Sequence, residues 1–137
     1  STEKMAVQIA DALREGGMEV KQLSMHACHR SDIATELLNA SALIVGSPVL
    51  NSGIFPSLAD VLCYLKGLRK KGLVGATFGS YGWSPAPIDE LGKMLETMGV
   101  QVVAPAVKSL FVPDETVLKN CRELGLTVSK EVAKKLQ

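Results

Sequence analysis

Aromatic and hydroxyl-bearing residues gather in two short segments that each follow an apolar run. Residues 47–53 read Ser-Pro-Val-Leu-Asn-Ser-Gly, and residues 79–84 read Gly-Ser-Tyr-Gly-Trp-Ser. The second segment holds the sole tryptophan, Trp83, in a chain of which only 4% is aromatic. An aromatic ring offers a flat apolar surface, and glycines let backbone amides come close to a ligand. The two segments therefore indicate a site for a flat ligand. The simpler alternative is that Tyr81 and Trp83 only cover the end of the core.

A third polar segment, Ser1-Thr2-Glu3-Lys4, stands at the start of a stretch with helical apolar spacing. Free backbone amides and the helix dipole make a helix N-terminus attractive to a phosphate group. Two hydroxyls there fit such a site, although serine and threonine are also ordinary N-cap residues.

Alternating helices and strands are expected to position these segments. Apolar spacing predicts helices near 5–15, 33–38, 58–68, 88–98 and 118–136, with an N-cap at Ser31-Asp32. Apolar runs predict strands at 19–23, 41–46, 73–78 and 100–104, the last extended at 111–112. This order predicts one α/β domain over residues 1–137, a three-layer α/β/α sandwich around a doubly wound parallel sheet. Ligands of such sheets bind beyond the carboxyl ends of the strands, where 47–53 and 79–84 fall.

The chain opens on a helix, whereas a doubly wound fold of strand order 2-1-3-4-5 begins with a strand in the middle of the sheet. Without it, the strands at 19–23 and 42–45 would both expose unpaired backbone. We therefore expect the native protein to carry an apolar strand immediately before Ser1, so that the given chain is N-terminally truncated.

The amino-acid composition disfavours several classes of partner and site. Fifteen Lys and Arg against fourteen Asp and Glu give a net charge of +1, which disfavours nucleic acid as a partner. The longest apolar runs are far shorter than the ~20 residues of a membrane span. Three widely spaced cysteines do not indicate a disulfide framework and favour a reducing compartment, the cytoplasm. Two histidines disfavour a multi-histidine metal centre.

Three motifs carry a family resemblance: Ser-Thr-Glu-Lys-Met-Ala at 1–6, Gly-Ser-Pro-Val-Leu-Asn-Ser-Gly at 46–53 and Phe-Gly-Ser-Tyr-Gly-Trp-Ser at 78–84. They resemble the flavodoxin-like domain of the flavodiiron proteins, also called A-type flavoproteins. The resemblance covers essentially the whole chain, and the Ser-Tyr-Gly-Trp-Ser stretch is its most specific part. It implies a flavodoxin-like fold that holds FMN at three loops.

The resemblance implies a residue set for FMN. Ser1 and Thr2 match the end of the phosphate loop, and residues 48–53 and 80–84 match the loops on either side of the isoalloxazine ring. The implied cofactor-binding residues are Ser1, Thr2, Pro48, Val49, Leu50, Asn51, Ser52, Gly53, Ser80, Tyr81, Gly82, Trp83 and Ser84.

Two positions depart from the family pattern. Val49 stands where threonine is usual and removes a hydroxyl that could reach the flavin. Pro85 stands where glycine is usual, which stiffens the loop and removes an amide donor. Both changes predict an altered flavin affinity or potential.

The resemblance also implies partners. Electrons would arrive from a rubredoxin-like or reductase donor and pass from FMN to a diiron centre that reduces dioxygen or nitric oxide. That centre would lie in a metallo-β-lactamase-like domain, whose ligand motif has no counterpart here. The chain would then be the redox domain of an oxidoreductase, catalytically incomplete alone, and its oligomeric state, homo-oligomer included, stays open.

Two other functions stay open: a free-standing flavodoxin-type electron carrier, and an interaction module that kept the fold without the flavin. The near-neutral charge and the Ser-Tyr-Gly-Trp stretch argue against the carrier. The expected missing strand and the two departures at Val49 and Pro85 favour the module.

Three other motifs give weaker indications of function. His26-Ala-Cys28-His29 offers soft metal ligands, but it lacks a fourth ligand and is interpreted as a surface loop. Arg69-Lys70-Lys71 is interpreted as a solvated turn, with docking of an acidic donor as the alternative. No histidine follows Ser80, so a hydrolase nucleophile is not expected there.

Overall fold

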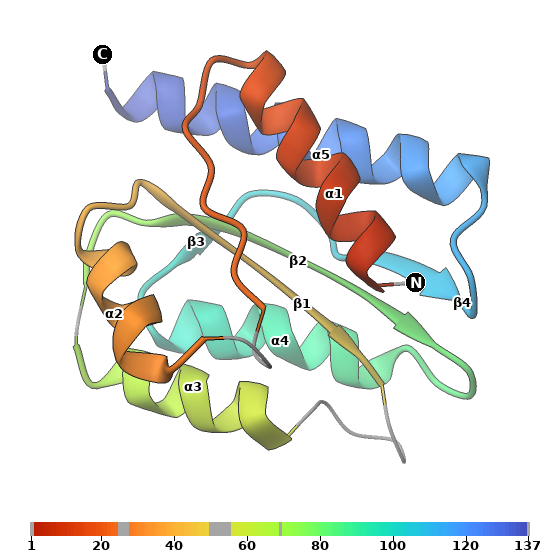
Figure 1. Ribbon diagram of the computed structural model, residues 1–137, viewed down its shortest axis with the longest axis horizontal. Helices are drawn as coiled ribbons and strands as arrows, with labels where there is room; N and C mark the ends of the chain where they lie inside the picture. Colours follow the sequence, from red (N-terminus) through yellow and green to blue (C-terminus); the bar gives the residue numbers. More distant parts are fainter. Residues whose placement is uncertain (1, 25–27, 50–55, 69, 137) are drawn as a thin grey trace.

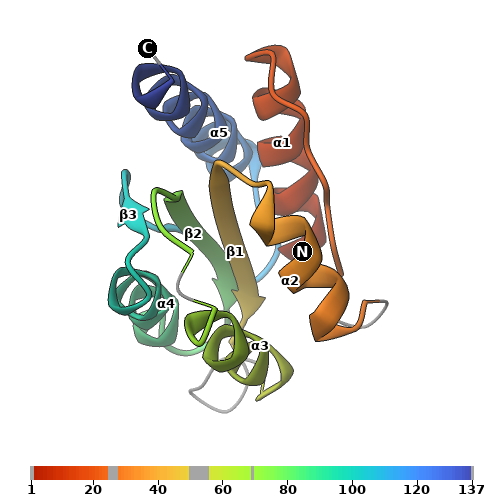
Figure 2. The same cartoon turned by 90° about the vertical axis from the view of Figure 1, so that its left-hand side faces the viewer.

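The computed structural model describes residues 2–24, 28–49, 56–68 and 70–136. Its helices are α1 (Thr2–Glu15), α2 (Arg30–Leu38), α3 (Pro56–Lys66), α4 (Ala86–Thr97) and α5 (Glu115–Lys135). Its strands are β1 (Ala42–Pro48), β2 (Val74–Tyr81), β3 (Gln101–Val102) and β4 (Val107–Leu110). Helices α1 and α5 cover one face of the sheet, and α3 and α4 cover the other (Figures 1 and 2). The predicted α/β/α sandwich is confirmed.

The sheet is parallel and centred on β2. Strand β1 pairs with one side of β2 from Ala42↔Val74 to Pro48↔Ser80. Strands β3 and β4 pair in turn with its other side. The carboxyl ends of β1, β2 and β4 therefore meet at one end of the sheet, where the two polar segments leave it.

Two apolar clusters fill the space between the sheet and its helices. The α1/α5 side holds Met5, Ile9, Val74, Phe78 and Val128, among others. The opposite side joins α2, α3 and α4 through residues such as Ile33, Leu62, Leu91 and Leu95. Within the described residues, no helix is both long and apolar enough to cross a bilayer.

Cys121 of α5 is fully buried in the α1/α5 cluster. Burial raises the pKa of its thiol to about 11 because the thiolate would lose its hydration. The thiol is therefore neutral at physiological pH, as suits a core residue.

Helices α1 and α5 approach each other closely at two glycines. A Cβ at Gly125 would lie 2.8 Å from the carbonyl oxygen of Ile9, and one at Gly16 would overlap the Ser129 hydroxyl. That hydroxyl donates to the Gly16 carbonyl at 3.3 Å. The small residues thus fix how α1 sits on α5.

The strand expected at 19–23 is wrong: these residues are extended but form no strand. They run at the β1 side of the sheet (Figures 1 and 2) and have no backbone hydrogen bond to any described residue. Val20 nevertheless packs against the α1/α5 cluster and Leu23 against the opposite one. The alternating apolar side chains of residues 19–23 therefore pack against the core, but among the described residues no strand lies beside them to pair with their backbone.

The last strand is divided. The sequence predicts one strand at 100–104 with an extension at 111–112, whereas β3 ends at Val102 and β4 occupies 107–110. The N–H of Val103 donates to Gly75, and the ladder resumes at Phe78↔Val107. Pro105 lies between and has no N–H to donate, so the chain bulges away from β2 there. Phe111 and Val112 lie just beyond β4.

Candidate functional site

Hydroxyl groups gather where α1 begins over the carboxyl end of β2. The Oγ1 of Thr2 lies 2.7 Å from the Oγ of Ser80, so a hydrogen bond ties the first residue of α1 to the end of β2. Ser80 is buried, and its register partner in β4 is Ser109. Two serines of neighbouring strands thus lie side by side, and one of them, Ser80, contacts the start of α1.

Ser109 differs from its neighbours in having no partner. Its side chain is 1% exposed, and its Oγ accepts or donates no hydrogen bond among the described residues. A buried hydroxyl without a partner costs free energy, so native proteins rarely keep one without reason. Nothing in the short run Val107–Leu110 singles out Ser109 in the sequence. Only the register between β2 and β4 connects it to Ser80.

The segment after β2 presents its aromatic residue outward. Trp83 is 89% exposed, so it does not cover the end of the core as the simpler alternative expects. Tyr81 is half-buried, and its carbonyl accepts the N–H of Phe111 at 2.8 Å. A Cβ on Gly82 would lie 3.0 Å from the Phe111 ring. Trp83 is thus held at the rim by a segment that is anchored to the end of β4.

Phe111 adds a second exposed aromatic ring that the sequence does not predict for this site. It is 65% exposed and has φ of +58°, a left-handed conformation that non-glycine residues rarely adopt. Leu110 and Val112 beside it are also more than half exposed. Several large apolar side chains therefore reach the surface together at the carboxyl end of the sheet.

Ser84 and Pro85 lead from this segment into α4. The Oγ of Ser84 accepts the N–H of Ala86 at 3.3 Å, and the Pro85 carbonyl accepts the N–H of Ile88 at 2.9 Å. Pro85 occupies the N-cap position with φ of −81°. The proline therefore begins a helix, which fixes the direction in which residues 80–84 leave it.

The segment after β1 lies against the end of β2. Pro48 pairs with Ser80, and the N–H of Val49 donates to the Ser80 carbonyl at 2.9 Å. The Val49 amide is therefore already used within the sheet. The other implied residues of this segment, Leu50, Asn51, Ser52 and Gly53, lie outside the described residues, as does Ser1. The structure thus brings together Thr2, Pro48–Val49 and Ser80–Ser84 at one end of the sheet.

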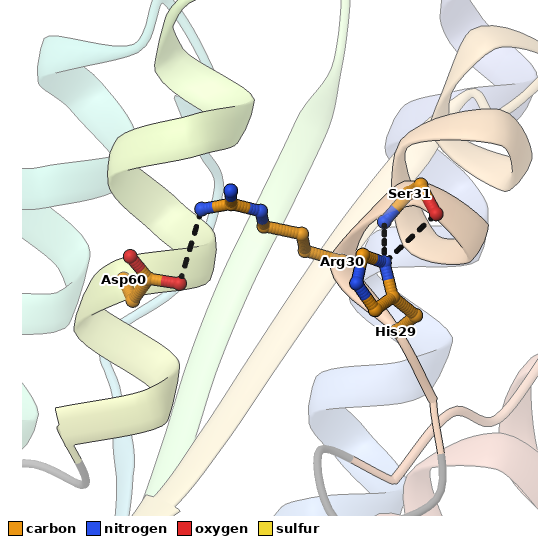
Figure 3. Close-up of polar contacts among 4 residues, drawn as sticks. All are labelled: His29, Arg30, Ser31 and Asp60. Carbon is orange, nitrogen blue, oxygen red and sulfur yellow. Dashed lines mark hydrogen bonds and ion pairs between the residues drawn. The ribbon is translucent and has the colours of Figure 1, made fainter.

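His29 has a structural role at the start of α2 (Figure 3). His29, rather than Ser31-Asp32, is the N-cap of α2: its Nδ1 accepts the N–H of Ser31 at 3.2 Å, and Asp32 accepts the N–H of His29. Arg30 reaches Asp60 of α3 at 3.4 Å and stacks on Tyr64.

Cys28 packs against the core, and His26 lies outside the described residues. No three His, Cys, Asp or Glu side chains among those described could hold a metal ion.

The basic turn lies at the opposite end of the sheet. The Nζ of Lys70 donates to the Leu38 carbonyl at 2.9 Å, at the end of α2, while Arg69 lies outside the described residues. Lys71 is exposed next to it. Because this turn precedes β2, it is separated from residues 80–84 by the length of that strand.

Known proteins are similar to this chain in sequence and in fold. The flavodoxin family pattern matches residues 1–125. The chain is 40% identical to the rubredoxin-oxygen oxidoreductase of Megalodesulfovibrio gigas over 99% of its length, and 38% identical to the nitric oxide reductase of Moorella thermoacetica over 97%. It spans about a third of the length of these relatives, 34% of each.

Solved structures agree. A structure of rubredoxin oxygen:oxidoreductase from Desulfovibrio gigas matches with a TM-score of 0.97, covering 99% of this chain and 34% of that one. A flavodoxin from the domain Archaea matches with a TM-score of 0.87 at 26% identity, covering 96% of this chain and 90% of that one. The resemblance to the flavodoxin-like domain of the flavodiiron proteins is thereby confirmed, and this family implies a flavin as the kind of cofactor. The chain belongs to the flavodoxin family.

Proposed function

We propose that this chain is the FMN-binding electron-transfer domain of a flavodiiron-type oxygen or nitric-oxide reductase. It would pass electrons from a rubredoxin-like or reductase donor to a diiron centre in a separate metallo-β-lactamase-like domain. The names of the relatives support this proposal, since one is a rubredoxin-oxygen oxidoreductase and another a nitric oxide reductase. The free cysteines Cys28, Cys63 and Cys121 suit a reducing compartment, and we place the protein in the cytoplasm.

The residues present suit FMN. The hydroxyls of Thr2 and Ser80, together with the amides at the start of α1, are groups that hold a phosphate. Pro48–Gly53 and Ser80–Ser84 would flank the ring, and Ser1 would join Thr2 at the phosphate. FMN itself supplies the redox chemistry by taking up one or two electrons, so the protein needs no acid–base pair and contributes orientation and electrostatics.

The observation that carries the proposal is the exposure of Trp83. An indole that is 89% exposed at the end of a core strand contributes little to folding, because it buries almost no surface. A flat ring stacked on it would recover that apolar contact. The hydroxyl pair at the start of α1 lies at the same end of the sheet, where a phosphate tail would be needed.

The sole tryptophan makes the test direct. Titrating the apoprotein with FMN should quench Trp83 fluorescence to a plateau at about one FMN per chain. Trp83→Ala should weaken FMN binding, measured by flavin fluorescence, whereas Tyr64→Ala on the outer surface of α3 should leave it unchanged. Absence of flavin absorbance after reconstitution with excess FMN, in the protein with its upstream residues restored, would contradict the proposal.

One observation favours a free-standing carrier as a second candidate. The archaeal flavodoxin is covered over 90% of its length, so this fold also exists as a protein of about this size. The net charge of +1 argues against it, because carriers of this type are usually acidic. The full-length gene decides between the two: a diiron domain in the same reading frame supports the reductase, and its absence supports the carrier.

We also propose that the native domain has a further parallel strand, placed between β1 and residues 19–23 and leading into α1. The Ser41 carbonyl and the Val49 N–H bond to β2, so the alternate residues Ala42, Ile44 and Gly46 direct their backbone groups to the other edge. No described strand pairs there.

Buried backbone groups without partners cost about 1–3 kcal/mol each, which an added strand would recover. The gene should therefore encode an apolar segment and a hydroxyl-rich loop upstream of Ser1. A native coding sequence beginning at Ser1 would refute the proposed strand.

A further inference from the structure

Phe111 holds a backbone conformation that its residue type disfavours. It directly follows β4 and has φ of +58°, the left-handed region in which the Cβ of a side chain crowds its own backbone. A turn that only led from β4 toward α5 would typically carry glycine or asparagine at such a position. Because the turn itself disfavours phenylalanine, the ring is expected to have a role of its own.

Burial in the core is not that role. Phe111 is 65% exposed and belongs to neither apolar cluster. Apolar stabilisation scales with the area removed from water, so a ring left mostly in solvent adds little to folding. The ring instead lies next to Gly82, where a Cβ would come within 3.0 Å of its Cε1 atom. The φ of Gly82 is not positive, so the nearness of the ring, rather than the backbone conformation, favours glycine at 82.

The segment that Phe111 contacts is held at few points. Strands β2 and β4 end on the same side of the molecule (Figure 1), and there the Phe111 N–H donates to the Tyr81 carbonyl at 2.8 Å. Beyond this bond, Gly82 and Trp83 form no backbone hydrogen bond with any described residue. Trp83 is almost fully exposed and gains no support from the core. The amide and the ring of Phe111 therefore support the segment at the point where it leaves the sheet.

We propose that Phe111 is a positioning residue for the flavin: its ring, turned toward Gly82 by the left-handed backbone, fixes the segment that presents Trp83. This inference rests on the proposed FMN site and adds to it a residue outside the three segments of the family resemblance. A segment that is ordered before its ligand arrives loses less conformational freedom on binding, and affinity rises accordingly. Phe111 thus acts on the flavin through Gly82 and Trp83.

Phe111→Gly separates a positioning role from a merely structural one. Glycine removes the ring and also relieves the left-handed backbone, so the variant should unfold at the same urea concentration as the unsubstituted protein or at a higher one. FMN binding, titrated in the protein with its upstream residues restored, should nevertheless weaken about threefold to tenfold, because the segment must now be ordered on binding. Unchanged FMN binding, or a loss of binding together with stability, would overturn the proposal.

Phe111→Tyr and Val112→Ala are the matched variants. Tyrosine keeps a ring beside Gly82, so it should keep the FMN affinity within about twofold of the unsubstituted value. Val112 is the chain neighbour of Phe111 and is 67% exposed, but the three atoms nearest to a Cβ at Gly82 all belong to Phe111. Val112→Ala should therefore leave FMN binding unchanged. A loss as large as that of Phe111→Gly would show that removal of any exposed apolar side chain has this effect, and would overturn the proposal.

The contact is also tested without FMN. Trp83 is the sole tryptophan of the chain, so its fluorescence anisotropy reports how firmly the segment is held on the nanosecond timescale. Phe111→Gly should lower this anisotropy, and Phe111→Tyr should not. Equal anisotropy in the unsubstituted chain and both variants would overturn the role of Phe111. Failure of the unsubstituted protein to bind FMN, with the anisotropy difference present, would instead count against the proposed function.

Discussion

Strands β1 and β2 are neighbours in one sheet, yet β1 is the more apolar in sequence and the less buried in the fold. β1 reads Ala-Leu-Ile-Val-Gly-Ser-Pro, and five of its seven residues keep intermediate exposure. β2 contains two glycines, a threonine and a serine, and its first seven residues are all buried. The difference lies in the neighbours: β2 is paired on both sides, and β1 on one.

The comparison teaches that burial follows pairing rather than composition. A run such as residues 42–45 is typical of strands covered on both faces and both edges. Leaving its outer edge open keeps Ala42, Leu43 and Ile44 partly exposed. The composition of β1 therefore suits a more central position than the one it holds among the described strands.

The largest expected effect comes from forcing the two strands apart. A Cβ on Gly79 would overlap the Ser47 carbonyl and lie 2.9 Å from Ile88 Cγ1. Gly79→Ala should therefore lower the free energy of unfolding by about 3 kcal/mol or more. Gly92→Ala is the control, because its Cβ meets nothing closer than 4.0 Å within helix α4. It should raise stability by about 0.5–1 kcal/mol in the same urea titration. Similar effects of both variants would contradict the close contact.

Because Cys121 of α5 is buried against the sheet, the free energy of unfolding should fall at alkaline pH. The pKa of Cys121 is about 11 in the folded protein, against 9.0 as the ordinary value. Because the folded pKa is raised, the stabilisation is complete below pH 9 and is lost as pH rises from 9 to 11. It amounts to about 2–3 kcal/mol. Cys121→Ala should remove this part of the slope, and Cys63→Ala, at an exposed site, should not. Equal slopes in the unsubstituted chain and Cys121→Ala would contradict the assignment.

Hydrogen exchange should reveal the open edge of β1 directly. Leu43, Val45 and Ser47 direct their N–H groups to β2, so they should exchange at least about tenfold more slowly than Ala42, Ile44 and Gly46. Adding the upstream strand should slow amide exchange at Ala42, Ile44 and Gly46, so that the two sets of amides exchange at similar rates. Uniform exchange along β1 in the given chain would show that its outer edge is already protected.

The smallest expected effect concerns the loop after β1. Val49→Thr adds a hydroxyl next to an amide that Ser80 already occupies. If that hydroxyl donates to the reduced flavin, the potential should rise by about 30–60 mV in a two-electron titration. Val7→Thr, on the exposed side of α1, should leave the potential unchanged. An unchanged potential in Val49→Thr would rule out the missing hydroxyl as a tuning group.

Sequence patterns predict the elements that are stabilised by local periodicity. Helix α1 and strand β2 appear close to their expected positions, because apolar spacing alone defines their buried faces. Residues 19–23 fail as a strand because alternation specifies faces and not a pairing neighbour. The split between β3 and β4 depends on Pro105 and on how many residues the bulge takes up.

The candidate site shows the same limit. Aromatic and hydroxyl residues mark 80–84 because they stand out in the sequence, and the structure places Ser80 against Thr2 and Val49. Ser109 is one serine in an unremarkable run, and its significance depends on register and burial. The position of Phe111 likewise depends on its left-handed backbone conformation, which the sequence pattern does not predict.

The close contacts of Gly16 and Gly125 restrict which residue types this fold can accept at these two positions. Each position admits a larger side chain only if the axis of one helix shifts relative to the other, and such a shift would also move the first turn of α1. Natural variants at 16 and 125 should therefore be few, although both positions are far along the chain from the loops that carry the chemistry. In directed evolution of this domain, changes there should alter ligand preference together with stability. Substitutions on the exposed face of α5 should change neither ligand preference nor stability by much.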